Sequence, residues 1–259
     1  MSQSEPTEPR ESDRTGLVLA AGFGARQTLE GEAVPKPLIP VAGRALILRT
    51  MDGLQAAGCS RVVVVLGHRA DQIRRFLDDA YDGPLDVIPV MNDEYRLGNG
   101  VSVLAARQHL PDDFVLSMAD HVFDPQVMDL VARHQSPPNG SALVVDSKLD
   151  SILDLDDATK VLVRESKVTR IGKGLTDFNA VDCGLFLAND ALLEALNGLY
   201  SRNGDVSLSE GVQVLATEGR MAALDLGKAR WQDVDTKEML SAAERLLPAE
   251  SLGISHPSS

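Results

Sequence analysis

The chain contains 259 residues, of which 44% are hydrophobic and 24% are charged. These proportions are typical of globular domains, so the length suits one large domain or two small ones and excludes wholesale disorder. With 25 Lys and Arg residues against 38 Asp and Glu residues, the formal net charge is −13, and such a field repels nucleic-acid phosphates and anionic lipids. We therefore expect no general role in binding nucleic acid or a membrane surface.

The composition of the two ends differs from that of the rest of the chain. Residues 1–14 are rich in Ser, Glu and Pro and lack the order of a secretory signal, so we expect a disordered leader there and a flexible tail at 248–259. A single domain is expected over 15–247, and no apolar run approaches the ~20 residues that span a bilayer. Cys59 and Cys183 are too few for a disulfide framework or a metal cluster, which favours reduced thiols and a cytoplasmic location.

Short apolar runs alternate with helix-period segments through the first half of the chain. The predicted strands are 17–21, 61–66, 86–90 and 114–118, and the predicted helices are 45–57, 70–80, 100–110 and 125–134. This alternation is typical of a parallel sheet with helices on both faces.

The pattern changes after the turn-forming residues 137–140. The predicted elements there are strands at 141–146, 160–164, 168–171, 181–188 and 221–226, a hairpin turn at 165–167, and helices at 191–199, 208–216 and 236–247. We interpret them as an extension of the same sheet. The sequence therefore predicts an α/β domain with a Rossmann-like, doubly wound sheet that is mixed but mostly parallel.

A glycine-rich turn follows the first predicted strand, in the sequence LAAGFGAR. Gly22 and Gly24 would let backbone N–H groups approach an anion, and Arg26 would add charge-assisted hydrogen bonds. An ordinary strand-ending turn explains the glycines equally well. A dinucleotide-binding fingerprint would need a third glycine where the chain has Gln27, and no Walker motif follows.

Three further charged residues stand in contexts that favour a binding role. Lys36 lies between two prolines that stiffen its backbone, which favours a phosphate ligand over a solvated charge. Asp120 follows a predicted strand, at the sheet edge where open α/β folds bind ligands, although it could equally cap a turn. Asp235 could likewise cap the last helix. Together the two carboxylates match the needs of Mg²⁺, which takes one or two of them plus substrate phosphates.

The sequences LAAGFGAR and PKPLIPVAGRALI together resemble the signature of the sugar-phosphate nucleotidyltransferase family. The later segments LGNGVS, MADH and WQDVDT fall where the resemblance predicts them, and the match runs from about residue 15 to 247. The resemblance implies a GT-A-like nucleotidyltransferase architecture. It also implies an enzyme that joins a nucleoside triphosphate to a phosphorylated small molecule and releases pyrophosphate.

The resemblance also implies roles for individual residues. Arg26, Lys36 and Asp120 would be catalytic, and Asp120 and Asp235 would hold Mg²⁺. The implied nucleotide-binding residues are Leu19, Ala20, Ala21, Gly22, Gly24, Asn99 and Gly100. His121 is interpreted as a neighbour of the acid that packs or stays in solvent, and Glu210 as a first-turn acid at a helix start.

Motifs in the middle of the chain indicate a subfamily within this resemblance. The order ATKV, IGK and then Asp-x-Gly-x-Phe is similar to that of CTP:inositol-1-phosphate cytidylyltransferases. This places the acceptor-binding part at about 141–227. Lys160 and Lys173 would grip the phosphate of the acceptor, and Asp182 would contact its hydroxyls or position the site.

The resemblance implies Mg²⁺-dependent transfer of CMP from CTP to a phosphorylated small molecule, with inositol 1-phosphate as the preferred acceptor, giving CDP-inositol and pyrophosphate. Phosphocholine, a phosphonate or a sugar 1-phosphate remain alternative acceptors. A non-catalytic nucleotide-binding regulator is the alternative of another class, and an NAD-binding oxidoreductase is weakened by the missing third glycine. The expected partners are the two small substrates, and a homodimer is left open.

Overall fold

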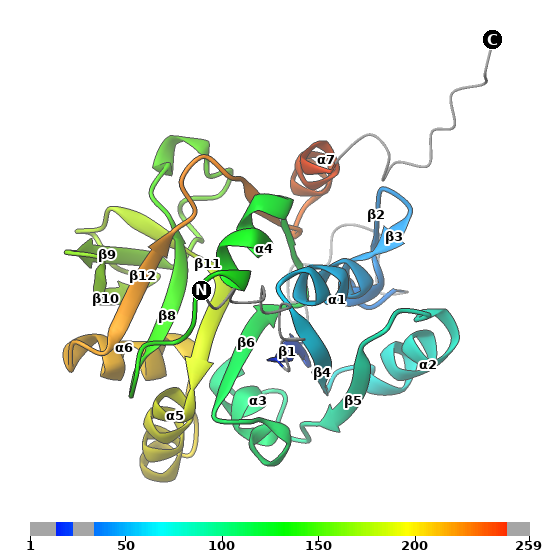
Figure 1. The fold of residues 1–259 in the computed structure, drawn as a ribbon, viewed down its shortest axis with the longest axis horizontal. Coiled ribbons are helices and arrows are strands. Elements are labelled where there is room, and N and C mark those ends of the chain that lie inside the picture. The colour runs from blue at the N-terminus through cyan, green and yellow to red at the C-terminus, as the bar shows by residue number, and fades with distance from the viewer. Residues whose placement is uncertain (1–13, 23–33, 248–259) are drawn as a thin grey trace, which may run out of the picture.

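A nine-stranded sheet runs through the fold of residues 14–22 and 34–247, the part of the chain that the computed structural model describes (Figure 1). In sheet order its strands are β5 (Asp86–Met91), β4 (Cys59–Leu66), β1 (Arg14–Ala20), β6 (Asp113–Met118), β11 (Ala180–Asn189), β8 (Ser141–Asp146), β12 (Met221–Asp225), β10 (Lys167–Gly172) and β9 (Lys160–Arg164). β11 and β10 run against the others, so the predicted mixed but mostly parallel α/β sheet is confirmed.

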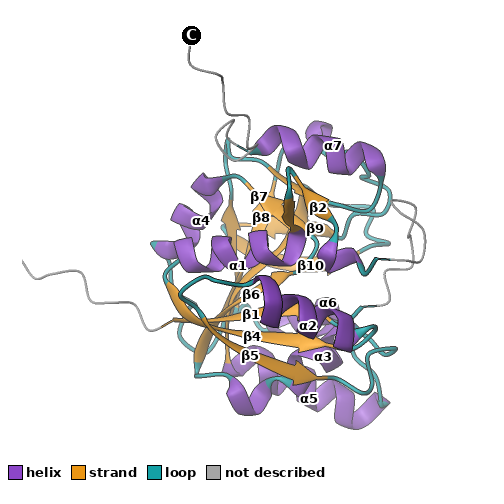
Figure 2. Cartoon of the chain, turned by 90° about the vertical axis from the view of Figure 1, so that its right-hand side faces the viewer, coloured by secondary structure: helices purple, strands orange, loops and turns teal. Residues whose placement is uncertain are grey.

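Helices cover both faces of the sheet (Figure 2). They are α1 (Leu46–Ala56), α2 (Ala70–Ala80), α3 (Asn99–Ala105), α4 (Pro125–Ala132), α5 (Asp190–Asn203), α6 (Leu208–Thr217) and α7 (Lys237–Leu246). The side chains of β1 alternate between the two faces, as a strand buried on both sides requires. Leu17 and Leu19 pack with α3, α5 and α6, whereas Val18 and Ala20 pack with α1, α2 and α4.

Most predicted elements are present with small shifts at their ends. The helix 70–80 and the strands 141–146 and 160–164 have the predicted bounds. The helix predicted over 100–110 ends early, because α3 stops at Ala105 and a short 3₁₀ helix, Arg107–His109, follows it. Leu110 then becomes extended ahead of Pro111, as residues before proline do.

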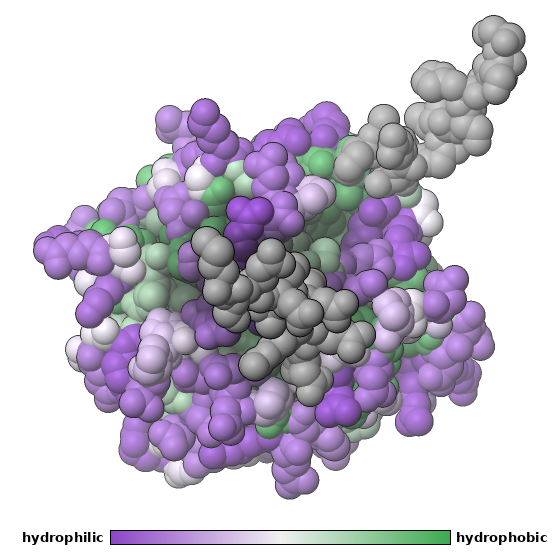
Figure 3. All heavy atoms as spheres, in the orientation of Figure 1, coloured by the Kyte–Doolittle hydropathy of each residue, from purple (hydrophilic) through white to green (hydrophobic). Residues whose placement is uncertain are grey.

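The first strand begins one residue before the predicted boundary of the domain, at Arg14. The rest of the predicted leader and the whole predicted tail lie outside the described residues. Among the residues that are described, no helix is both long enough and apolar enough to cross a bilayer. Hydrophilic side chains cover most of the face shown in Figure 3, with hydrophobic ones between them.

Four very short strands were not predicted. They are β2 (Pro40–Val41), β3 (Arg44–Ala45), β7 (His121–Phe123) and β13 (Trp231–Asp233). β7 and β13 form an antiparallel pair in which His121 lies opposite Asp233, and the N–H of Val234 donates to the carbonyl oxygen of Asp120 over 3.0 Å. This pairing carries the segment before α7 to the end of β6, although the two segments are far apart in sequence.

The β9–β10 hairpin offers a test of backbone strain. Glu165 and Ser166 join the paired residues Arg164 and Lys167, and both have positive φ, 50° and 58°, as a type I′ turn requires. Asn and Gly adopt such values at lower cost, so the double substitution Glu165→Asn with Ser166→Gly should raise the free energy of unfolding by about 1 kcal/mol. Urea unfolding measures the change. Unchanged or lower stability would contradict the turn assignment.

Candidate active site

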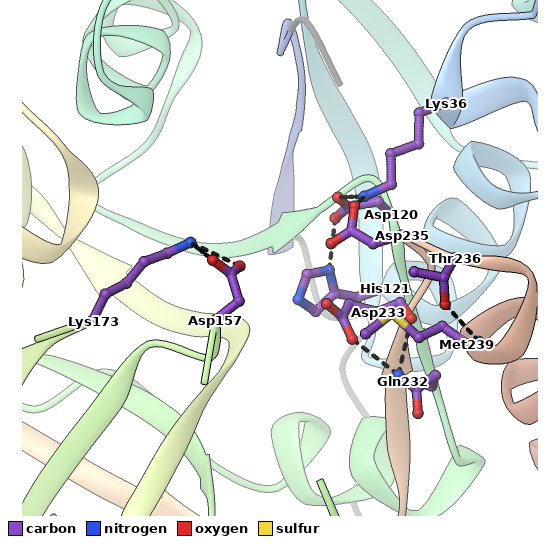
Figure 4. A network of polar contacts seen from close by, with 10 residues as sticks. All are labelled: Lys36, Asp120, His121, Asp157, Lys173, Gln232, Asp233, Asp235, Thr236 and Met239. Atoms are coloured by element: carbon purple, nitrogen blue, oxygen red, sulfur yellow. Dashed lines mark hydrogen bonds and ion pairs between the residues drawn. The ribbon is translucent and has the colours of Figure 1, made fainter. Parts of the chain in front are cut away.

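Lys36, Asp120 and Asp235 meet beyond the carboxyl end of β6 (Figure 4). The ammonium of Lys36 donates to Asp120 Oδ2 over 2.6 Å and to Asp235 Oδ1 over 2.5 Å. The three side chains are 14%, 25% and 20% exposed, respectively. The structure therefore brings together three of the four predicted catalytic and metal-binding residues. The fourth, Arg26, lies outside the described residues.

Local structure fixes the position of Lys36. It stands between Pro35 and the buried Pro37, and it begins a 3₁₀ helix, Lys36–Leu38, for which Pro35 is the N-cap. The N–H of Leu38 donates to the carbonyl oxygen of Pro35 over 2.8 Å and closes this turn. Because both prolines restrict the backbone, the ammonium is presented from a rigid segment, as the sequence predicts.

Asp235 does not cap the last helix. The N-cap of α7 is Thr236, whose Oγ1 accepts from the N–H of Met239 over 3.2 Å. Asp235 is held beside Asp120 by the β7–β13 pairing, and its carboxylate turns to Lys36 instead. The alternative in which this residue only caps a helix is therefore wrong.

The charges of the cluster shift the pKa values of Lys36 and Asp120 in opposite directions. Burial alone would lower the pKa of Lys36, but the attraction of Asp120 and Asp235 outweighs it and raises that pKa above the ordinary value. Burial would likewise raise the pKa of Asp120, but the charges of Lys36 and His121 hold it well below its usual range. Lys36 and Asp120 are therefore charged at neutral pH.

His121 contacts the cluster directly, which the interpretation of it as a packing or solvated neighbour misses. Its Nδ1 lies 2.6 Å from Asp120 Oδ1, and its ring stacks on Trp231 with centroids 5.3 Å apart. Burial opposes its charge, yet Asp120 raises the pKa of His121 above the ordinary value. An acid-His pair directly after a buried strand is the sequence signal that points to this residue.

A cavity of about 460 Å³ opens beside the cluster, a volume within the usual range for small-molecule sites. Asp235 and His121 form part of its wall. Its other charged side chains are Asp146, Lys148, Asp154, Asp157, Lys173, Asp182, Arg230, Asp233 and Arg245. Among the described residues of this wall carboxylates outnumber Lys and Arg side chains, so an anionic ligand needs a specific orientation within it.

The predicted acceptor residues are placed differently from one another. Lys173 lines the cavity, with its ammonium 2.8 and 2.9 Å from the two carboxylate oxygens of Asp157 (Figure 4). Asp182 also lines the cavity, and its Oδ1 accepts from the N–H of Gly184 over 2.7 Å. Lys160 is not on the cavity wall. It is 9% exposed and donates to the carbonyl oxygen of Asp156, so its ammonium is bound to the backbone instead of lining the cavity.

The predicted nucleotide-binding residues surround the end of β1 and the start of α3. Leu19, Ala20 and Ala21 are buried, with 6%, 3% and 2% exposed, while Gly22 is exposed and a Cβ there would meet open space. Gly24 lies outside the described residues.

Asn99 lines the cavity, but its Oδ1 accepts from the N–H of Leu208 over 2.8 Å, which leaves its amide N–H groups for a ligand. Gly100 has a packing role, since a Cβ would lie 2.8 Å from the carbonyl oxygen of Val206. Glu210 completes a capping box with Ser207 at the start of α6, which confirms its interpretation as a helix-start acid.

The two carboxylates of the cluster fit the needs of a hard divalent cation. Oxygen atoms of Asp120 and Asp235 already share one cationic group, the ammonium of Lys36. Mg²⁺ characteristically binds one or two carboxylates and takes its other ligands from water and substrate phosphates. The donor set therefore suits Mg²⁺ held jointly by the protein and a nucleotide.

The solved structure of the inositol-1-phosphate CTP transferase from T. maritima has the same fold, with a TM-score of 0.78 and 29% identity over 91% of this chain and 95% of that one. The architecture is thus that of the α/β nucleotidyltransferases. Residues 16–210 match the model of the MobA-like NTP transferase domain, and the chain belongs to that family.

Two curated relatives are both named bifunctional IPC transferase and DIPP synthase. The protein from Archaeoglobus fulgidus is 36% identical over 231 residues, which cover 89% of this chain and 43% of the relative. The protein from Rubrobacter xylanophilus is 35% identical over 245 residues, which cover 93% and 54%. The chain thus spans about half the length of these relatives.

Asp182 provides a pH-dependent test of the site. Burial raises its pKa to about 6, so the folded state resists its ionisation. The contribution of Asp182 to the free energy of unfolding is therefore largest below the ordinary carboxyl pKa of 3.8 and falls as the pH rises towards 6. Asp182→Asn keeps the oxygen that accepts from Gly184 but cannot ionise.

The variant should therefore match the wild type at pH 4 and exceed its free energy of unfolding by on the order of 1–3 kcal/mol at pH 8. Chemical unfolding at both pH values measures the difference. A gain that is equal at both values would show that ionisation of Asp182 is not its cause.

Proposed function

We propose that this protein transfers CMP from CTP to a phosphorylated polyol, with inositol 1-phosphate as the preferred acceptor, giving CDP-inositol and pyrophosphate. The observation that carries the proposal is the convergence of Lys36, Asp120 and Asp235 beside a cavity with a carboxylate-rich wall. The membership of the NTP transferase family and the likeness to an inositol-1-phosphate CTP transferase support it.

The chemistry needs little proton transfer. A phosphate oxygen of the acceptor is already anionic, so it attacks the α-phosphorus of CTP in line and pyrophosphate leaves without a dedicated general base. The protein has to orient the two phosphates and offset their charge. Lys36 supplies a fixed positive charge at the cluster, and Arg26 would add a second from the glycine-rich turn.

Asp120 and Asp235 would hold Mg²⁺ at this point, and the bound ion would offset phosphate charge that the two carboxylates alone would repel. In the structure Lys36 bridges both carboxylates. When the two carboxylates serve as ligands of the metal ion, the ammonium of Lys36 would be released from them and would contact the triphosphate. The role of Lys36 is therefore electrostatic rather than acid–base, consistent with its raised pKa.

The cavity wall favours a hydroxyl-rich acceptor. Asp157 and Asp182 offer carboxylate oxygens, which accept hydrogen bonds from hydroxyls, and Lys173 lies beside Asp157 as a phosphate partner. A quaternary ammonium acceptor such as phosphocholine prefers an aromatic cage, and Trp231 is the one indole on this wall within the described residues. The choice of cytosine rests on the likeness to the inositol-1-phosphate CTP transferase from T. maritima.

A cytoplasmic location is also inferred. Cys59 and Cys183 are both buried free thiols in the structure, as expected of a protein from a reducing compartment.

A substrate screen tests the proposed function. Pyrophosphate release should be measured with Mg²⁺ and each common nucleoside triphosphate against inositol 1-phosphate, phosphocholine, aminoethylphosphonate and glucose 1-phosphate. We expect the highest kcat/KM for CTP with inositol 1-phosphate. Preference for another acceptor would overturn the acceptor assignment and keep the reaction class, whereas CTP binding without turnover for any pair would favour the non-catalytic regulator.

Asp120→Ala tests the cluster itself. Removal of one preorganised charge contact should lower kcat on the order of 100-fold or more, with the fold intact because Lys36 keeps Asp235 as a partner. Asp86→Ala is the matched control, since Asp86 is an ion-paired surface carboxylate with a side chain 61% exposed and does not line the cavity. Circular dichroism monitors folding. Pyrophosphate release near the wild-type rate by Asp120→Ala would refute the metal and catalytic assignments.

A further inference from the structure

His121 is the best-supported of the side chains around the cluster that have no assigned role. Its Nδ1 lies 2.6 Å from Asp120 Oδ1. Because an ionised carboxylate can only accept, Nδ1 carries the proton and donates it to this bond. One side chain thus binds each oxygen of Asp120, since Lys36 donates to Oδ2 over 2.6 Å.

Aromatic packing fixes the plane of the His121 ring. Trp231 stacks on it with ring centroids 5.3 Å apart and ring planes inclined by 14°. The ring of Phe123 also stacks on it, with a centroid distance of 6.2 Å and an interplanar angle of 28°. The indole is itself fixed, because Trp231 Nε1 donates to Asp146 Oδ2 over 3.1 Å. Asp146 is 2% exposed and also accepts from Lys148 Nζ over 2.7 Å, so a continuous set of polar and ring contacts runs from Lys148 to Asp120.

The opposite edge of the ring fits into a space left by a glycine. Gly184 has a φ of 69°, and a Cβ there would lie 2.8 Å from His121 Nε2 and 2.8 Å from Met118 Cγ. Asp182 Oδ1 accepts from the N–H of Gly184 and holds this backbone in place. The ring therefore has no room to rotate away from Asp120 on this side.

These contacts matter for the orientation of one carboxylate. Torsion about the last bond of an Asp side chain is soft, so a carboxylate held at a single oxygen can turn. We propose that His121 is a positioning residue that holds Asp120 through Nδ1, so that Oδ2 faces Lys36 and Asp235. The proposal rests on the proposed function, in which Asp120 is a metal ligand, and such outer partners characteristically set ligand orientation and affinity.

Two amide substitutions distinguish the roles of the two ring nitrogens of His121. In His121→Asn the amide nitrogen takes the place of Nδ1, and in His121→Gln it reaches the place of Nε2, while His121→Ala removes both. Mn²⁺ binding is measured by calorimetry with the full chain and no nucleotide, and kcat is measured with the best substrate pair. The Ala and Gln variants should bind Mn²⁺ about 10- to 100-fold more weakly and lose kcat to a similar extent, whereas Asn should keep most of both.

Each other outcome overturns the proposal. Rescue by Gln rather than Asn would show that Nε2 acts directly on a ligand. Wild-type Mn²⁺ affinity in His121→Ala, or equal losses in all three folded variants, would show that the bond to Asp120 does not set orientation.

A measurement on the unaltered protein covers the case in which the variants do not fold. Long-range ¹H–¹⁵N NMR of His121 should show a protonated Nδ1, and a bare Nδ1 would overturn the proposal. Failure of the wild type to release pyrophosphate from any substrate pair counts against the proposed function, and the NMR result then decides the role of His121 separately.

Discussion

The site depends on one ammonium group placed between two carboxylates that would otherwise repel each other. Lys36 lies within 2.6 Å of an oxygen of both Asp120 and Asp235, with 14% of its side chain exposed. Desolvation of such a cluster has a large cost, and a buried ion pair is weak evidence for stability. A cluster at the carboxyl edge of the sheet, beside a cavity, is better explained by chemistry than by folding.

A small apolar cluster beneath the site holds the three charged segments together. It consists of Ile39, Val41, Leu46, Val122, Val234 and Ala243, with Leu240 and Leu247 packed against it. Ile39 follows Lys36, Val122 follows Asp120 and Val234 precedes Asp235, so each charged residue has an anchor within a few positions. Burial of these anchors, at roughly 1.5–3 kcal/mol for each large aliphatic side chain, offsets the cost of bringing the charges together.

The parts of this arrangement that follow from sequence are the local ones. Buried strands such as 61–66 are evident from a run of apolar residues, and the rigidity of Lys36 from its flanking prolines. The β7–β13 pair could not be predicted, because three-residue strands are too short to show a period and their pairing joins distant segments.

The same limit explains the ambiguities at single residues. Asp235 and Thr236 are both good N-cap residues, and the β7–β13 pairing together with the ion pair to Lys36 leaves Thr236 as the residue that caps α7. Lys160 and Lys173 look equivalent in sequence. In the structure the ammonium of Lys160 donates to a backbone carbonyl, whereas Lys173 lines the cavity. At these positions the role of a residue therefore depends on tertiary contacts, which the local sequence pattern does not reveal.

The charge distribution also constrains how an acceptor can lie. The chain carries a net charge of −13, and carboxylates outnumber Lys and Arg among the described residues of the cavity wall, so orientations that place a ligand phosphate against these carboxylates are disfavoured. In the proposed reaction the phosphate of the acceptor is stabilised near a cationic group such as Lys36, Lys173 or a bound metal ion, and its hydroxyls then face carboxylates such as Asp157 and Asp182. Repulsion thus contributes to specificity alongside attraction, because an anionic group in the place of those hydroxyls would remain unpaired against carboxylates.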